Sequence, residues 1–156
     1  MTDQKQIKKL IEPLFFLFHK KLFPASEALL LNFQQQALKQ NIPQTVVGQL
    51  TDFYQVTNGI PSLDSFTFHD CGDKHLFEWW NGKRELWLGR RDDDILRWKN
   101  NHFCLGDSTT VSYSDEYVFS TLRELFEKSF EKWYLGLWFR FMDSHNEIDL
   151  WRAQTS

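Results

Sequence analysis

Two short stretches of the sequence gather the residue types that bind metals or carry out acid–base chemistry. The first, HDCGDKH, contains His69, Asp70, Cys71, Asp73 and His75. The second, HFCLGD, contains His102, Cys104 and Asp107. In a strand, a histidine and a cysteine two positions apart project from the same face. Adjacent strands would then bring the two His–Cys pairs together as ligands for zinc.

The spacing of these residues argues against such a site, because it matches none of the CxxC or HxxxH arrangements that present zinc ligands. HFCLG alternates as a half-buried strand does, with Phe103 and Leu105 on the face opposite Cys104. There is also no GxSxG nucleophile elbow, and neither cysteine lies in a cysteine-protease motif. The sequence therefore predicts no catalytic residues, no metal site and no cofactor. The alternative is a small metal-dependent hydrolase built on His69, Cys71, His75, His102 and Cys104.

Other polar and aromatic groups allow two further interpretations. Asp92, Asp93 and Asp94 resemble a magnesium-binding cluster, but consecutive side chains point in different directions, which favours a solvated turn. The tryptophans Trp79, Trp80, Trp87 and Trp98 could form a stacking platform for a sugar or a peptide. Alternation assigns at least half of them to the core, because neighbours such as Trp79 and Trp80 face opposite sides of a regular strand.

Composition limits the class of protein. A chain of 156 residues with 42% hydrophobic and 17% aromatic residues is expected to form one domain with an aromatic core. Residues 1–40 carry a net charge of +3 and the remainder −6, so no basic stripe is available for nucleic acid. Two cysteines make no disulfide framework. The apolar run Leu14–Phe18 is too short for a signal peptide or a membrane span, so we expect a cytoplasmic protein.

Periodicity predicts helices at the start of the chain. Apolar residues recur at helical spacing over residues 4–23, where Pro13 would kink or restart the helix. Ser26 is the expected N-cap of a second helix. A third, with Val46, Val47, Leu50, Phe53, Tyr54 and Thr57 on one face, begins after Pro43. Asn58 and Gly59 would close it, with Gly59 at positive φ.

From residue 65 the period changes to two, which predicts short aromatic strands. Asn81-Gly82 gives the clearest hairpin signal. Thr121 and Glu124 have the spacing of a capping box at the start of a helix over residues 121–134. Together these patterns predict an α+β fold with N-terminal helices, an antiparallel-rich sheet of about five to seven short strands, and a C-terminal helix packed on the sheet.

Three segments, in this order, resemble a known family. They are IPQTVVGQLTDFYQVTNGI (42–60), HFCLGD (102–107) and EYVFSTLRELFEKSFEKWY (116–134). Together they are similar to the SUKH superfamily, the Smi/Knr-like domain. The resemblance implies one domain, with residues 1–41 as a helical segment, 42–134 as the family-like core and 135–156 as an extension.

The resemblance also implies a function without catalytic residues. Many bacterial members resemble immunity proteins, which bind and neutralise a cognate toxin, often a nuclease; others resemble intracellular scaffold domains. We therefore expect a protein partner, no nucleic acid, no membrane, and a monomer or weak dimer. Binding residues tend to lie on loops and strand ends, and exposed tryptophans are favoured anchors. The candidates are Glu78, Trp80, Asp92, Asp93 and Asp94, with Glu78 and Trp80 sharing the exposed face of one strand.

Overall fold

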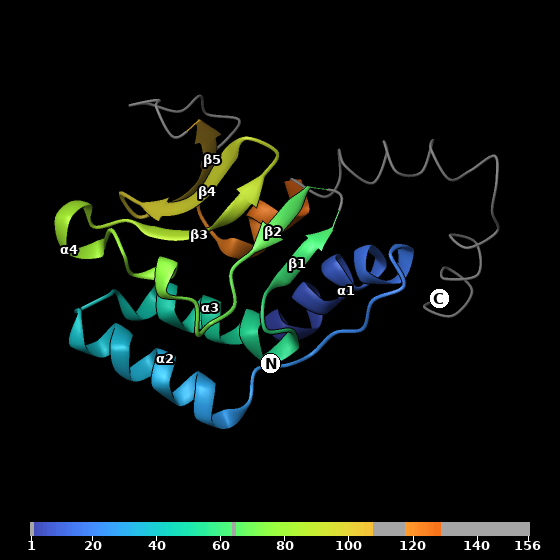
Figure 1. Ribbon diagram of the computed structural model, residues 1–156, viewed down its shortest axis with the longest axis horizontal. Helices are drawn as coiled ribbons and strands as arrows, with labels where there is room; N and C mark the ends of the chain where they lie inside the picture. The colour runs from blue at the N-terminus through green and yellow to red at the C-terminus, as the bar shows by residue number, and fades with distance from the viewer. Residues whose placement is uncertain (1, 64, 108–117, 129–156) are drawn as a thin grey trace.

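The chain opens with three helices, which the computed structural model places together on one side of a sheet (Figure 1). The structure describes residues 2–63, 65–107 and 118–128. The helices are α1 (Thr2–Leu17), α2 (Glu27–Lys39) and α3 (Gln44–Val56). They confirm the three predicted helices, although α1 ends at Leu17 and continues past Pro13. None of the described helices is long and apolar enough to cross a membrane.

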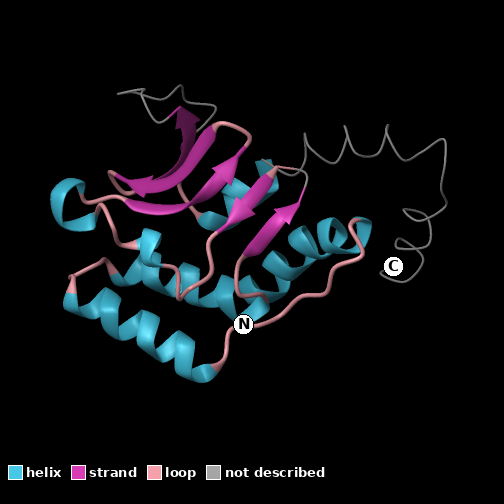
Figure 2. Cartoon of the chain, viewed as in Figure 1, coloured by secondary structure: helices cyan, strands magenta, loops and turns pink. Residues whose placement is uncertain are grey.

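The other main element is an antiparallel sheet in which each strand pairs with the next in sequence (Figure 2). Its strands are β1 (Ile60–Leu63), β2 (Phe66–Phe68), β3 (Leu86–Arg91), β4 (Asp94–Lys99), β5 (His102–Asp107) and β6 (Val118–Phe119). Between β2 and β3 the chain forms a short 3-10 helix, η1 (Lys74–Leu76), and a single helical turn, α4 (Trp80–Lys83). The predicted α+β fold is confirmed.

The core lies between the helices and one face of the sheet. The predicted face of α3 is buried, and Phe53 and Tyr54 from this face contact Phe68 of β2 at ring-centroid distances of 4.4 and 6.2 Å. Phe33 of α2 meets the ring of Tyr54 edge-on at 5.3 Å. Because α3 packs against both α1 and α2, it is the central helix of the layer (Figure 1).

The helix predicted after β6 is present in the described residues and helical over 122–128. The hydroxyl of Thr121 accepts a hydrogen bond from the amide of Glu124 at 3.0 Å, and the Glu124 carboxylate accepts one from the amide of Ser120 at 3.1 Å. The first bond confirms Thr121 as the N-cap with the predicted spacing to Glu124, whereas the Glu124 carboxylate binds the amide one position before the N-cap and not that of Thr121 itself. Gln49 of α3 accepts a hydrogen bond from the amide of Leu122, which ties the new helix to α3. The predicted positions 129–134 lie outside the described residues.

The hairpin predicted at Asn81-Gly82 is wrong, because both residues belong to the helical turn α4. Trp80, which begins this turn, is buried, and its Nε1 donates to the carbonyl oxygen of Gln40 at 2.8 Å. This bond holds the segment against the helical layer instead of extending it along the sheet. Within this segment the left-handed backbone conformation is found at Arg84, the C-cap of α4, with φ 53°.

The tight hairpins of the sheet lie elsewhere. Asp92 and Asp93 connect β3 to β4, and Asp92 has φ 52°. Asn100 and Asn101 connect β4 to β5 with φ 53° and 64°. Positive φ at both central residues is the conformation of a type I′ turn, whose twist matches that of the strands it joins. Asparagine therefore serves at this turn where glycine is more often found.

Gly59 has φ +86°, as predicted, and this left-handed conformation is the first constraint on the position. It does not close α3, because the C-cap of the helix is Thr57, which is extended, and Gly59 belongs to the connection into β1. A second constraint comes from β2, because a Cβ at this position would lie 2.7 Å from the carbonyl oxygen of Phe68. Real side chains do not approach backbone oxygens so closely. Only glycine lets the chain pass from α3 into β1 along this path.

We expect Gly59→Ala to lower the free energy of unfolding by more than about 1 kcal/mol, since it adds both left-handed strain and a backbone clash. Gly48→Ala is the matched control: Gly48 lies in α3, and its added Cβ meets nothing within 4 Å. That change should stabilise the protein by up to about 1 kcal/mol through helix propensity. Urea unfolding of both variants measures the difference, and equal stabilities would contradict the assignment.

Phe103 and Leu105 lie in the same buried cluster as Leu122, Leu125 and Phe126, as the strand alternation predicts. Phe103→Ala should cost about 3–5 kcal/mol, because the side chain is fully buried and leaves a cavity. Leu38→Ala, at a side chain that is 65% exposed, provides the control and should change stability by less than about 1 kcal/mol. Similar thermal midpoints for the two variants would exclude a core position for Phe103.

Candidate functional site

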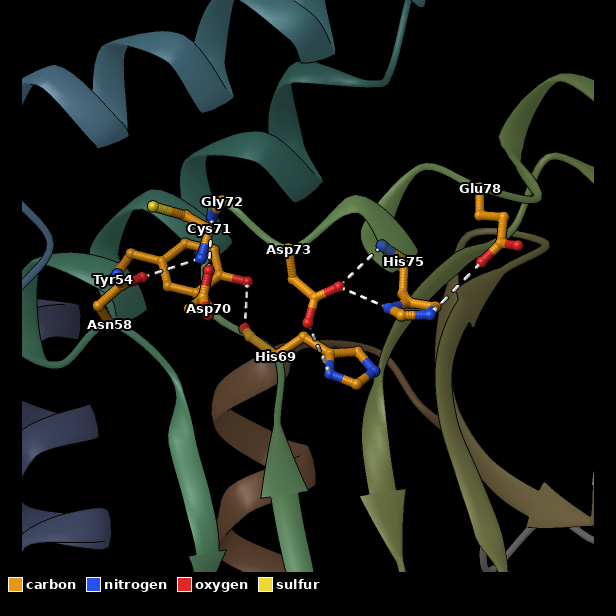
Figure 3. A network of polar contacts seen from close by, with 9 residues as sticks. All are labelled: Tyr54, Asn58, His69, Asp70, Cys71, Gly72, Asp73, His75 and Glu78. Atoms are coloured by element: carbon orange, nitrogen blue, oxygen red, sulfur yellow. Dashed lines mark hydrogen bonds and ion pairs between the residues drawn. The ribbon is translucent and has the colours of Figure 1, made fainter.

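The most concentrated group of ionisable side chains in the described structure lies where β2 ends and η1 begins (Figure 3). Asp73 stands between two imidazoles. Its Oδ1 is 2.7 Å from Nδ1 of His75, and its Oδ2 is 3.4 Å from Nδ1 of His69. The two rings are stacked, with centroids 5.7 Å apart and planes at 29°. We call these three residues, His69, Asp73 and His75, the His–Asp cluster.

The connection that carries the His–Asp cluster is fixed to α3 by hydrogen bonds. The hydroxyl of Tyr54 donates to the carbonyl oxygen of His69 at 2.9 Å. The side-chain oxygen of Asn58 accepts a bond from the amide of Cys71 at 2.8 Å (Figure 3). Asp70 accepts a bond from the amide of Gly72, which tightens the turn. The cluster therefore sits on a turn whose backbone conformation is set by the preceding helix.

The environment of the His–Asp cluster changes the pKa of two of its members. Burial is the largest effect on His69 and lowers its pKa from the ordinary 6.5, although Asp73 opposes this. Burial alone would raise the pKa of Asp73, but hydrogen bonds from the amide and the ring of His75 outweigh it, and the pKa falls below 3.8. Both groups therefore hold fewer protons when folded. Their contribution to stability is present at neutral pH and is lost on acidification, below pH 6.5 for His69 and below 3.8 for Asp73.

The structure does not assemble a nucleophile with the His–Asp cluster. Cys71 is buried, and its sulfur points away from both imidazoles (Figure 3). Burial raises the pKa of the Cys71 thiol, so the reactive thiolate is disfavoured. The same holds for Cys104 on β5, whose pKa burial also raises.

The two chemistry-bearing stretches of the sequence lie apart. β2 and β5 are separated by β3 and β4, a spacing of about 14 Å across the sheet. The His–Cys pair at 69 and 71 also follows β2 instead of lying in it, so the strand spacing considered above does not apply. Among the described residues, no group of three or more His, Cys, Asp or Glu side chains is arranged to hold a metal ion.

Four of the seven tryptophans lie in the described residues, and they form two pairs on opposite faces of the sheet. Trp80 and Trp98 are buried and stacked at 5.9 Å, so they belong to the core. Trp79 and Trp87 pair at 5.3 Å on the other face, where Lys83 lies over the Trp79 ring. This arrangement agrees with the expectation that at least half of the tryptophans are core residues.

The outer face also carries a buried ion pair. Nη1 of Arg97 on β4 is 3.1 Å from Oε1 of Glu85, and Nε1 of Trp87 donates to the same oxygen. Burial by itself would raise the pKa of Glu85, but these two hydrogen bonds reverse the effect and the pKa is lowered. The pair is directed into the fold, where it orients the rings and strands around it.

The partner-binding residues predicted from the sequence are distributed over different parts of the molecule. Glu78 is half exposed, and its carboxylate lies 3.9 Å from Nε2 of His75, beside the His–Asp cluster. Trp80 is 3% exposed, so the predicted shared strand face of Glu78 and Trp80 is wrong: the segment is helical and the indole is in the core. Asp92 and Asp93 are exposed in the β3–β4 turn, and Asp94 begins β4.

A surface that the sequence did not indicate lies at the end of α3. Phe23 is 72% exposed, and its carbonyl oxygen accepts a hydrogen bond from the amide of Asn58 at 2.6 Å. Asn58 in turn holds the turn containing Asp70 and Gly72. Leu29 of α2 is 42% exposed, and its Cδ2 would lie 3.7 Å from a Cβ at Gly72. We call these five residues, Phe23, Leu29, Asn58, Asp70 and Gly72, the α3-end surface.

The one sequence signal for this surface is the dipeptide Phe23-Pro24. It follows the apolar pattern of α1 and precedes the N-cap Ser26, so Phe23 belongs to neither helix. Phe23 also donates its amide to the hydroxyl of Thr57, and Ala25 donates to the carbonyl oxygen of Tyr54. These bonds fix an extended segment whose aromatic side chain is directed outward.

Comparison of the chain with known protein families, curated proteins and solved structures finds no match. The assignment of a role therefore depends on the residues and contacts described above.

We predict that the purified protein carries no stoichiometric zinc, because the His–Asp cluster turns both Nδ1 atoms toward one carboxylate and the His102–Cys104 pair lies three strands away. Plasma-emission analysis of protein purified without chelator tests this. A content near one metal per chain that is lost in His69→Ala or His102→Ala would favour the hydrolase alternative.

Proposed function

We propose that the chain is a non-enzymatic protein-binding module of the bacterial immunity type, which neutralises a cognate toxin in the cytoplasm by direct binding through the α3-end surface. The observation that carries the proposal is Phe23, a large aromatic side chain that is 72% exposed on a backbone held by hydrogen bonds. The resemblance of three sequence segments to the SUKH superfamily supports the same class of function.

Phe23 has the properties of an interface anchor. Aromatic side chains with few rotatable bonds contribute much contact area for a small loss of conformational entropy, and they dominate many interfaces. The backbone of Phe23 is already ordered by bonds to Thr57 and Asn58, so binding does not need to order it. Leu29 adds a second exposed apolar group, beside Gly72.

Charge indicates what kind of partner this surface fits. The connection over residues 69–78 carries Asp70, Asp73 and Glu78 against a single basic residue, Lys74. Phe23 and Leu29 lie in residues 1–40, whose net charge is +3, so the acidic part of the surface is this connection. A partner with a basic face is therefore favoured, and the phosphate-binding cleft of a nuclease toxin is such a face.

The closest alternative is an intracellular scaffold domain that uses the same surface for a housekeeping partner. The two differ in genetic context, because an immunity protein is encoded beside its toxin. The metal-dependent hydrolase is less favoured, since its five residues fall into groups separated by two strands of the sheet.

The test uses the toxin domain encoded next to this gene, with affinity measured by titration calorimetry. Phe23→Ala should weaken binding by about 30-fold or more, which corresponds to a hot-spot loss of about 2 kcal/mol. Leu38→Ala is the matched control, because Leu38 is 65% exposed on α2 and outside the α3-end surface. It should leave the affinity within about threefold of the native protein.

A third variant separates the α3-end surface from the acidic turn that the sequence favours. Replacing Asp92, Asp93 and Asp94 with lysine should leave the affinity of the α3-end surface largely intact. The turn begins beyond Arg91, whereas the amide of His69 binds the carbonyl oxygen of Leu88 in the middle of β3. If the lysine replacements abolish the protection of cells against the toxin and Phe23→Ala does not, the interface lies on the β3–β4 turn. A neighbouring toxin that binds none of the proteins would refute the immunity proposal.

A further inference from the structure

The His–Asp cluster has two imidazoles but only one carboxylate between them. Asp73 uses Oδ1 for both the amide and the ring Nδ1 of His75, at 2.8 and 2.7 Å. Its Oδ2 faces Nδ1 of His69 at 3.4 Å. An Nδ1–H on each ring satisfies this carboxylate, so both neutral rings are held in the same tautomer. Each Nε2 then remains available for a second proton.

The charges around the cluster come from several elements. On its own connection, Asp70 favours the protonated form of His69 and His75 opposes it. Across the sheet, Arg90 of β3 also opposes it. Glu78, which precedes α4, faces Nε2 of His75 at 3.9 Å. The side chain of His75 is 48% exposed and has Glu78 beside it, whereas the side chain of His69 is 21% exposed.

We propose that the His–Asp cluster is a pH-sensitive element that takes up protons in two coupled steps, and that the second step breaks the cluster and loosens the connection between β2 and η1. With one proton, the single negative charge of Asp73 balances a single imidazolium. With two protons, stacked cations 5.7 Å apart lie on either side of Asp73, and the Glu78 carboxylate is close to His75. Like charges at this distance oppose each other, so the rings separate.

The consequence for binding rests on the proposed function, whereas the coupled titration does not. Each proton taken up by the cluster adds a positive charge beside Asp70 and Asn58 of the α3-end surface. A basic partner would then bind less tightly in acidic solution than at neutral pH.

The coupling is tested on the protein alone by following the ring protons of each histidine by NMR between pH 8 and pH 5. In the native protein, His69 and His75 should titrate at separate midpoints. His75→Asn should raise the midpoint of His69 by about 0.5 or more, since a competing cation is removed. Asp73→Asn should lower it by a similar amount. His102→Asn is the matched control, because His102 is exposed at the β4–β5 hairpin, and it should change neither midpoint.

Hydrogen exchange reports on the second step. The amide of Cys71 is bonded to Asn58, and the amide of His75 is bonded to Asp73. In the native protein, the protection of these two amides from hydrogen exchange should therefore fall several-fold between pH 7 and pH 5, after correction for the intrinsic exchange rate. The amide of Leu96 in β4, at the centre of the sheet, provides the internal reference and should keep its protection. The proposal would be overturned if His69 and His75 had the same titration midpoint and neither variant moved it. It would also be overturned if the exchange protection of the Cys71 and His75 amides did not change with pH. Neither result would bear on whether Phe23 binds a partner.

Discussion

The hydrogen bond from the Tyr54 hydroxyl to the carbonyl oxygen of His69 joins the two halves of the fold. Tyr54 is fully buried on α3, and its ring contacts Phe33 of α2 and Phe68 of β2. Burial raises the pKa of Tyr54 well above its ordinary value, so the phenol remains a donor at any physiological pH. A single side chain thus packs the helical layer onto the sheet and sets where β2 ends. The position of the His–Asp cluster follows from that end point.

Local sequence signals account for most of the fold. Ser26, Gly59 and Thr121 carry the capping and turn chemistry that the structure uses, because these interactions involve residues within a few positions of each other. The strand alternation places Phe103 and Leu105 in the core as predicted, but the strand is not half-buried, because Cys104 on the opposite face is buried as well. The hairpin predicted at Asn81-Gly82 is wrong because a contact with a distant residue determines the conformation of this segment. The Trp80 indole is hydrogen-bonded to the carbonyl oxygen of Gln40, forty positions earlier, and the turn is helical.

The site was less accessible to sequence reasoning. The HDCGDKH stretch does contain the His–Asp cluster, but strand spacing pairs His69 with Cys71, whereas the folded turn pairs it with Asp73. Asn58 determines this pairing, because its side-chain oxygen accepts a hydrogen bond from the amide of Cys71, and the Cys71 sulfur is then directed into the protein. The dipeptide Phe23-Pro24 marks a segment outside both helices, but it does not indicate that the Phe23 side chain is exposed. That exposure results from hydrogen bonds to residues more than thirty positions away, so only the three-dimensional structure reveals it.

The edges of the described sheet constrain how a partner can approach. On β1, Pro61 has no amide proton to offer, and β6 has only two residues. A peptide that extends a sheet by adding a strand needs a continuous row of free donors and acceptors, which neither edge presents. Under the proposed function, recognition at the described edges would depend on side chains and not on backbone pairing. Backbone pairing tolerates many sequences, whereas side-chain contacts are particular to one partner, so these edges fit the proposed role with a single cognate partner.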